Sequence, residues 1–351
     1  MRSSSNRVAG RIDLPTAPGP AGPRLAVRHP MLNPLPPSDH STAVLLLLDG
    51  LLPTRSQRTA STLLALVLGI VAVSCTAKAP RLPADVEIVR DVEYGTGNGQ
   101  PLKMHVLRPR TLLAEPMPVV VFVGGTNDYV LPPLARLAQR GYCCATMEFR
   151  MGEQVTFPAP LEDCKCAIRF LRAKAAAYHL NPDRIAVWGP SAGGHLAALV
   201  GTTGDTKDFE GQGGWPDYSS RVQAVVDWFG LSGYLRQVPE ADPVRYVTPD
   251  DPPFLIMHGD RDKLVPLQIS EQLHTSLIKA GVEATFKVVR GAGHGGPAFS
   301  NRECTELLDA FLDRHLKAGP KSGSPKPPSG DPNPRAGARQ STDESNRSLR
   351  L

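Results

Sequence analysis

The residue best suited to chemistry is Ser191, which stands between small residues at the end of a β-rich run. The run Arg184–Trp188 leads into Gly189-Pro190-Ser191-Ala192-Gly193, and a helix of small residues follows. Gly-x-Ser-x-Gly between a strand and a helix is typical of a nucleophile elbow, a sharp turn that exposes a strained serine hydroxyl. Gly189 and Gly193 are required there because side chains would strike the neighbouring strand or helix.

A serine hydroxyl becomes a good nucleophile when a histidine takes its proton, and a carboxylate must orient that histidine. Asp262 follows the apolar run Phe254–Gly259, and His294 lies in a glycine-rich loop after the run Ala284–Val289. The order serine, aspartate, histidine, with both partners after later strands, is the order in which this elbow is used. We favour Asp262 over Asp260, because Asp260 directly adjoins the strand and is suited to supporting its turn.

Taken singly, each partner has an ordinary alternative. Aspartates in turns are usually solvated turn residues, and a histidine among glycines is often a surface residue. Three other histidines, His195, His258 and His274, lie on or beside expected regular structure, so we interpret them as structural.

Oxyanion stabilisation needs backbone N–H groups beside the serine. The N–H of Ala192, at a helix N-terminus, is one candidate. The turn Gly124, Gly125 and Thr126, which follows the apolar run Val119–Val123, supplies the others. The alternative is a plain turn, and which of its three residues would donate stays open.

The segments that must position these residues alternate β-rich runs with amphipathic helices. The expected helices are Pro160–Tyr178, Pro266–Ala280 and Asn301–Lys317, and the expected opening hairpin joins Val86–Tyr94 to Leu102–Leu107. Such alternation predicts an α/β fold with a mostly parallel central sheet, helices on both faces, and the site at the carboxyl ends of the strands.

The stretch from about Val86 to Leu316 resembles the α/β-hydrolase serine esterases. It is most similar to the bacterial feruloyl and acetylxylan esterase-like group and to the hormone-sensitive-lipase-type carboxylesterases. The segments that carry the resemblance are 134–142, 181–185, 188–199, 219–227, 250–266 and 291–296. The resemblance implies an α/β-hydrolase fold and a catalytic triad of Ser191, Asp262 and His294.

The chain departs from the family pattern in two places. Such esterases usually carry His-Gly-Gly after the third strand, whereas no histidine precedes Gly124 and Gly125. Relatives often insert a long cap after the strand Ala224–Gly230, but here only Leu231–Pro253 is available. A short cap predicts an open cleft that tolerates bulky or polymer-attached acyl groups better than long buried lipid chains.

Both ends of the chain differ in composition from the part between them. We expect residues 1–54 to be a disordered proline-rich extension, 83–317 to be the catalytic domain, and 318–351 to be a disordered basic tail. Residues 55–75 combine basic residues, the apolar run Leu63–Val73 and a small residue before Cys75, as in an export signal of lipoprotein type. We therefore expect an exported protein that is periplasmic, secreted or anchored to the membrane by a lipid on Cys75. The alternative for Leu63–Val73 is a short hydrophobic helix without a targeting role.

The formal net charge is +5 over 351 residues. Residues 1–60 and residues 317–351 each hold seven Lys or Arg and three Asp or Glu, which leaves −3 for the part between them. The excess positive charge therefore lies in the two ends of the chain. No basic stripe interleaved with aromatic residues occurs, so we expect no nucleic-acid partner.

Four cysteines fall in the expected domain core. Cys143 and Cys144 are expected to end a buried strand, and Cys164 and Cys166 lie on an expected helix. Their spacing suits no zinc site. Buried free thiols are the default interpretation, and a disulfide between the two pairs after export is the alternative.

Together these features predict a serine carboxylesterase for short acyl esters or polysaccharide-linked esters, with no metal and no cofactor. One alternative is a peptidase of the prolyl-oligopeptidase type, which usually adds a propeller, although no blade-length repeat occurs here. The other is a catalytically silent fold used as a binding module. The altered turn at Gly124 favours that alternative, and the presence of Ser191, Asp262 and His294 argues against it.

Overall fold

The computed structural model describes residues 81–317, apart from residues 112, 153–154, 205 and 233–237. The expectations for residues 1–54, 55–75 and 318–351, including Cys75, therefore fall outside the described residues. Within the described part, β1 (Val86–Gly97) and β2 (Gln100–Pro109) form the expected opening hairpin. The other strands are β3 (Met117–Phe122), β4 (Cys143–Met147), β5 (Leu180–Pro190), β6 (Ala224–Trp228), β7 (Phe254–Gly259) and β8 (Ala284–Val289).

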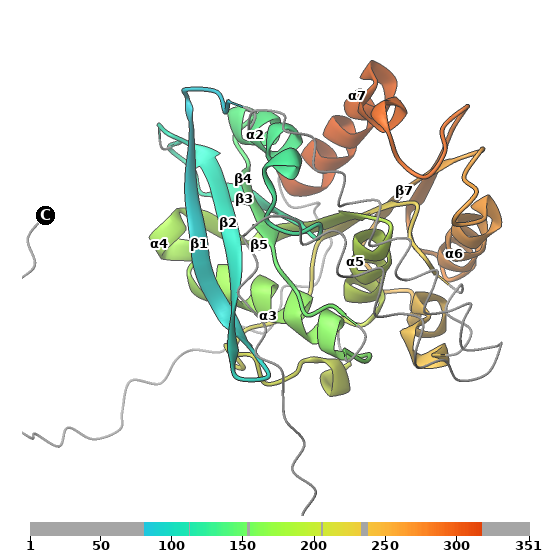
Figure 1. Ribbon diagram of the computed structural model, residues 1–351, viewed down its shortest axis with the longest axis horizontal. Coiled ribbons are helices and arrows are strands. Elements are labelled where there is room, and N and C mark those ends of the chain that lie inside the picture. Colours follow the sequence, from blue (N-terminus) through green and yellow to red (C-terminus); the bar gives the residue numbers. More distant parts are fainter. Residues whose placement is uncertain (1–80, 112, 153–154, 205, 233–237, 318–351) are drawn as a thin grey trace, which may run out of the picture. The chain divides into compact units, whose positions relative to one another are not determined.

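These strands form one sheet in the order β1-β2-β4-β3-β5-β6-β7-β8 (Figure 1). Strand β2 pairs antiparallel with β1 and β4, and all the other pairings are parallel. The prediction of a mostly parallel sheet is confirmed. Parallel strands end at the same edge, so the loops after β3, β5, β6, β7 and β8 meet there.

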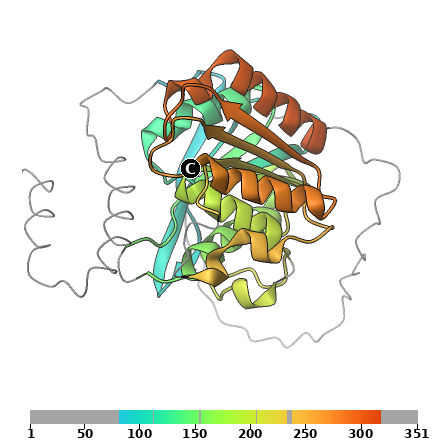
Figure 2. The same cartoon turned by 90° about the vertical axis from the view of Figure 1, so that its right-hand side faces the viewer.

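Helices cover both faces of the sheet (Figures 1 and 2). The apolar faces of α2 (Leu131–Gln139) and α7 (Arg302–Leu312) pack on one side. Those of α3 (Ala159–Ala173), α5 (Ala192–Thr202) and α6 (Leu267–Lys279) pack on the other. The central strands are accordingly apolar on both faces, and all six side chains of β3 are buried.

Two boundaries differ from those expected. Cys143 and Cys144 begin β4 rather than end a strand, because the chain turns at Gly141, where φ is +90°, just before β4. The helix expected over Pro160–Tyr178 is interrupted at Lys174, which separates α3 from the short α4 (Ala175–Tyr178).

The cysteines of the described part are free and buried: Cys143, Cys144, Cys164, Cys166 and Cys304. Successive side chains of a strand point to opposite faces. Cys143 accordingly lies in the core beside α3, and Cys144 lies in the core on the other side of the sheet. The two neighbours in the strand therefore cannot both reach α3. Burial raises the pKa of Cys143 to about 12, so this thiol stays un-ionised.

The segment between β6 and β7 is short, as expected. Its described part contains two single 3₁₀ turns, Pro239–Ala241 and Pro243–Tyr246. In the part of the chain that the structure describes, no helix has both the length and the apolar character needed to cross a membrane.

Candidate active site

Ser191 lies between the end of β5 and the start of α5 in a strained backbone conformation, with φ 53° and ψ −119°. The turn leaves no space for side chains on its glycines. A Cβ on Gly189 would lie 2.3 Å from the carbonyl carbon of Gly193, and a Cβ on Gly193 would lie 1.8 Å from the carbonyl oxygen of Val123. The elbow is therefore packed directly against the end of β3, and it holds the serine hydroxyl at the N-terminus of α5.

The imidazole of His294 lies between Ser191 and Asp262. Its Nε2 is 2.8 Å from the Oγ of Ser191, and its Nδ1 is 2.7 Å from the Oδ2 of Asp262. A carboxylate only accepts hydrogen bonds, so Nδ1 carries the proton and Nε2 accepts from the serine hydroxyl. The structure thus brings together the three residues that the sequence singled out. It places Asp260 elsewhere, with Oδ1 accepting from the N–H of Gly291 at 2.6 Å.

The side chain of Asp262 is fully buried. Its Oδ1 accepts from the N–H groups of Leu264 and Val265 at 2.8 and 2.9 Å. Its Oδ2 faces His294 and also the Nε2 of His258, which is 3.3 Å away. Burial alone would raise the pKa of Asp262, but these hydrogen bonds outweigh burial and hold the pKa well below its ordinary value. The aspartate is therefore ionised when it faces His294.

The ring of Phe229 packs edge-on against the imidazole of His294, with 4.8 Å between the ring centroids. Phe229 follows β6 with φ 44°, in a turn where the Oδ1 of Asp227 accepts from the N–H of Gly230 at 2.8 Å. The Oδ2 of Asp227 is buried and has no hydrogen-bond partner among the described residues. Burial raises the pKa of Asp227 to about 7. Asp227 thus supports the turn that carries Phe229, and sequence analysis singled out neither residue.

Two side chains of the β4 end hold the turn after β3. The Thr146 hydroxyl donates to the carbonyl of Gly125, and the Thr126 hydroxyl donates to Oε1 of Glu148 at 3.1 Å. Gly125 has φ +81°, which favours glycine. The sequence offered no signal for Thr146 or Glu148, because their contact depends on β4 lying next to β3. That the N–H groups of Gly124–Thr126 and of Ala192 bind an oxyanion stays a prediction.

The chain is similar to known proteins in both sequence and structure. Residues 109–237 match the BD-FAE family model, and residues 226–319 match the prolyl oligopeptidase family model. Esterase LipC of Mycobacterium tuberculosis is 30% identical over 242 residues, covering 59% of this chain and 59% of LipC. Esterase LipQ of the same organism is 28% identical over 259 residues, covering 63% of this chain and 61% of LipQ. The chain thus spans somewhat more than half the length of these two relatives.

Among solved structures, a truncated carbohydrate esterase from gut microbiota is 26% identical, with a TM-score of 0.61 over 69% of this chain and 100% of that one. Esterase 2 of Thermogutta terrifontis, phosphorylated by paraoxon, is 26% identical, with a TM-score of 0.60 over 69% and 98% of the two chains. The chain has the α/β-hydrolase fold. The predicted fold class and the resemblance to esterases of this fold are confirmed.

The three histidines that we interpreted as structural differ in their surroundings. His195 is buried on α5, its Nδ1 has no hydrogen-bond partner among the described residues, and burial lowers its pKa to about 4. His274 on α6 stacks on Phe286. His258, in contrast, reaches the aspartate that faces His294. The described residues contain no group of three or more His, Cys, Asp or Glu that could hold a metal ion.

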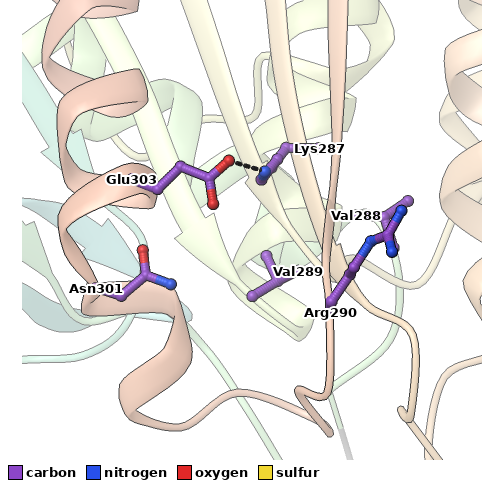
Figure 3. Close-up of a pocket in the computed structure, with 6 residues that line it drawn as sticks. All are labelled: Lys287, Val288, Val289, Arg290, Asn301 and Glu303. Carbon is purple, nitrogen blue, oxygen red and sulfur yellow. Dashed lines mark hydrogen bonds and ion pairs between the residues drawn. The ribbon is translucent and has the colours of Figure 1, made fainter.

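A surface cavity of about 340 Å³ lies between β8 and the start of α7 (Figure 3). It is lined by Lys287, Val288, Val289, Arg290, Asn301 and Glu303. Lys287 points toward Glu303 and pairs with it across the cavity. None of the three triad candidates lines this cavity, so it forms no part of the arrangement around Ser191.

Proposed function

We propose that this α/β-hydrolase is a serine carboxylesterase that hydrolyses short-chain or carbohydrate-linked acyl esters through an acyl-enzyme. The observation that supports this proposal is the position of His294 between the buried Asp262 and Ser191, which lies in the strained turn between β5 and α5. The esterase names of LipC and LipQ and the carbohydrate esterase of known structure support the ester class.

The geometry corresponds to a stepwise acyl transfer. Ser191 attacks the ester carbonyl while Nε2 of His294 takes its proton, and Asp262 stabilises the imidazolium that results. The N–H groups of Ala192 and of the turn Gly124–Thr126 bind the developing oxyanion. His294 then gives its proton to the leaving alcohol. In the second half, His294 deprotonates a water molecule that attacks the acyl carbon, and the imidazolium then returns this proton to Oγ of Ser191 as the bond between Oγ and the acyl group breaks and the acid leaves. Each step uses protein groups and water.

A panel of p-nitrophenyl esters from acetate to laurate, together with acetylated xylan, tests this proposal on the full chain and on Ser191→Ala. We expect turnover of the short esters, labelling of Ser191 by a fluorophosphonate, and loss of both in the variant. The short cap leads us to expect no steep rise in rate with acyl length. Rates that climb steeply toward laurate would contradict the open cleft, and an unlabelled, inactive wild type would contradict the esterase itself.

Peptidase activity is the second candidate, because residues 226–319 match the prolyl oligopeptidase family model. A matched pair of substrates, one ester and one p-nitroanilide with the same acyl group, separates the two. We expect the ester to be preferred. Amide turnover at a rate equal to that of the ester would favour the peptidase.

We also propose that the protein is exported and carries a lipid on Cys75, on the strength of the apolar run Leu63–Val73 and the small residue before the cysteine. Expression of the full chain in a bacterial host, followed by fractionation and mass spectrometry of the N-terminal peptide, tests this. We expect a lipid-modified Cys75 in the membrane fraction and release of the protein by Cys75→Ser. An unprocessed N-terminus in the cytosol would contradict it.

A further inference from the structure

A second serine–histidine pair contacts the same aspartate as His294. His258, at the end of β7, has Nδ1 2.7 Å from the Oγ of Ser270, which lies on α6. The Nε2 of His258 is 3.3 Å from Oδ2 of Asp262 and 3.0 Å from the carbonyl oxygen of Val265. Both members of this pair are buried. The side chains thus form one continuous series, Ser270–His258–Asp262–His294–Ser191.

The partners of His258 determine where its proton lies. Its Nε2 faces a carbonyl and a carboxylate, which both accept, so this nitrogen carries a proton. Its Nδ1 faces the Ser270 hydroxyl, which can donate. A neutral imidazole therefore satisfies every group when Ser270 donates to Nδ1 and Nε2–H points to Val265 and Asp262. The two acceptors at Nε2 thus determine the tautomer, and the Ser270 hydroxyl satisfies the nitrogen that is left without a proton.

We propose that His258 is a positioning residue for the catalytic aspartate. Its Nε2–H holds Oδ2 of Asp262 in line with Nδ1 of His294, while two backbone N–H groups hold Oδ1. Ser270 supports this arrangement by hydrogen-bonding Nδ1 of His258, which fixes the orientation of the ring. The inference rests on the proposed function, because it assigns Asp262 its role in the triad.

The donor also changes the charge that His294 meets. With the negative charge of Oδ2 shared between two N–H groups, less of it is available to stabilise a His294 imidazolium. Loss of the His258 donor should therefore leave more of that charge to stabilise the imidazolium and move the acid limb of the pH–rate profile to higher pH. Asp260, Arg261 and Lys263 adjoin Asp262 in its loop, and Asp227 in β6 interacts electrostatically with His258. Because His258 lowers the pKa of Asp227, Asp227 is replaced by Asn in every protein compared, so that its titration does not contribute to the difference.

The decisive pair of variants is His258→Leu and His258→Gln in the full chain. Leucine removes both ring nitrogens, whereas the glutamine amide can still donate toward Asp262. We expect kcat/KM for p-nitrophenyl acetate to fall about a hundredfold in His258→Leu, as misplacement of a catalytic group typically causes. We expect the acid limb to move to higher pH in the same variant. In His258→Gln, most of the rate and the position of the limb should be recovered. Equal losses in both variants with an unmoved acid limb would mean that His258 only fills space, and would overturn the proposal.

Ser270→Ala provides a second test that removes a single hydroxyl and does not depend on the folding of His258→Leu. The low-field proton resonance of His294 Nδ1–H is recorded without substrate in this variant and in the wild type. We expect a displaced resonance and a severalfold lower kcat/KM. An unchanged resonance and rate would contradict the role of Ser270 and His258. If the wild type hydrolyses no ester, the proposed function fails, while the resonance still reports whether His258 acts on the Asp262–His294 contact.

Discussion

The two serine–histidine pairs that share Asp262 contain the same residue types at similar distances, yet they differ in what they can do. Ser191 stands outside regular structure with φ 53°, and its histidine is 11% exposed. Ser270 lies within α6, and its histidine has no exposure. A hydroxyl hydrogen-bonded to an imidazole is thus not sufficient for a nucleophile. We expect access for the substrate and nearby backbone N–H groups to distinguish the reactive pair, Ser191–His294, from the supporting pair, Ser270–His258.

The pairs also use their imidazoles in opposite senses. His294 turns Nδ1 toward the aspartate and Nε2 toward its serine, whereas His258 turns Nε2 toward the aspartate and Nδ1 toward its serine. Phe229 packs against both rings, with its centroid 4.8 Å from that of His294 and 6.5 Å from that of His258. The aspartate is therefore held between two rings that the same phenylalanine contacts.

Replacing each serine by alanine is the strongest test of the difference between the two serine–histidine pairs. We expect Ser191→Ala to lower kcat about 10⁶-fold, as loss of a triad nucleophile does. Ser270→Ala should lower it less than about tenfold, because Ser270 acts only through His258. Steady-state assays with p-nitrophenyl acetate and fluorophosphonate labelling measure both. Comparable losses in the two variants would contradict the division into a reactive and a supporting pair.

Asp262→Asn removes the negative charge that the two pairs share. We expect kcat to fall about 10⁴-fold, because the amide can hold His294 in the wrong tautomer and cannot stabilise its imidazolium. The pH dependence of kcat/KM and a fluorophosphonate labelling rate provide the measurement. Asp260→Asn is the matched control, since that side chain accepts from the N–H of Gly291 and makes no hydrogen bond or ion pair with the triad candidates among the described residues. A larger effect in the control would reassign the catalytic acid.

We expect the turn after β3, residues 124–126, to serve the pair Ser191–His294 by supplying N–H groups for the oxyanion. We expect Thr126→Val to lower kcat about tenfold to a hundredfold with little change in KM. The turn would lose its hydrogen bond to Glu148, and its N–H groups would no longer be oriented toward the oxyanion. Glu148→Gln alone keeps an acceptor for the Thr126 hydroxyl, so this control variant should keep most of the wild-type kcat. Wild-type kcat in Thr126→Val would show that this contact does not position the turn.

Asp227→Asn tests the turn that carries Phe229. The pKa of this carboxyl is about 7 in the folded protein, against about 3.9 when unfolded. Its contribution to stability is therefore fully present below pH 4 and is lost as the pH rises to 7. Over that interval, the free energy of unfolding of the wild type should fall by roughly 2–4 kcal/mol relative to the variant. Urea unfolding at pH 4, 5.5 and 7 measures it. The opposite trend of His195 is common to both proteins and cancels in the difference. A constant difference across this interval would mean that Asp227 is charged when folded.

Much of the site was predictable because its signals are local. Small residues on both sides of Ser191 are forced by the contacts of Gly189 and Gly193, so the elbow is visible in the sequence. Asp262 follows the fully buried run Phe254–Gly259 and His294 follows the β-rich run Ala284–Val289, which predicts their place at one edge of a parallel sheet.

The supporting residues lacked such signals. The Thr126–Glu148 bond requires β3 and β4 to be neighbours, and the His258–Ser270 bond requires α6 to return against the end of β7. Neither pairing leaves a spacing that the sequence alone reveals. The cysteine strand was misplaced for a related reason, since a run of buried residues does not show where the chain turned to begin it.

Strand β8 is the last in the sheet order and pairs with β7 alone among the described strands. The loop that leaves it carries His294, so fraying of this border would pull the base away from Ser191 while the elbow and the inner strands stay intact. On heating, we expect inactivation to begin some degrees below the loss of the far-ultraviolet circular dichroism signal, because edge segments open at lower free energy than the centre of a sheet. The loss of turnover on heating would then report the local unfolding of the β8 edge rather than the unfolding of the whole domain.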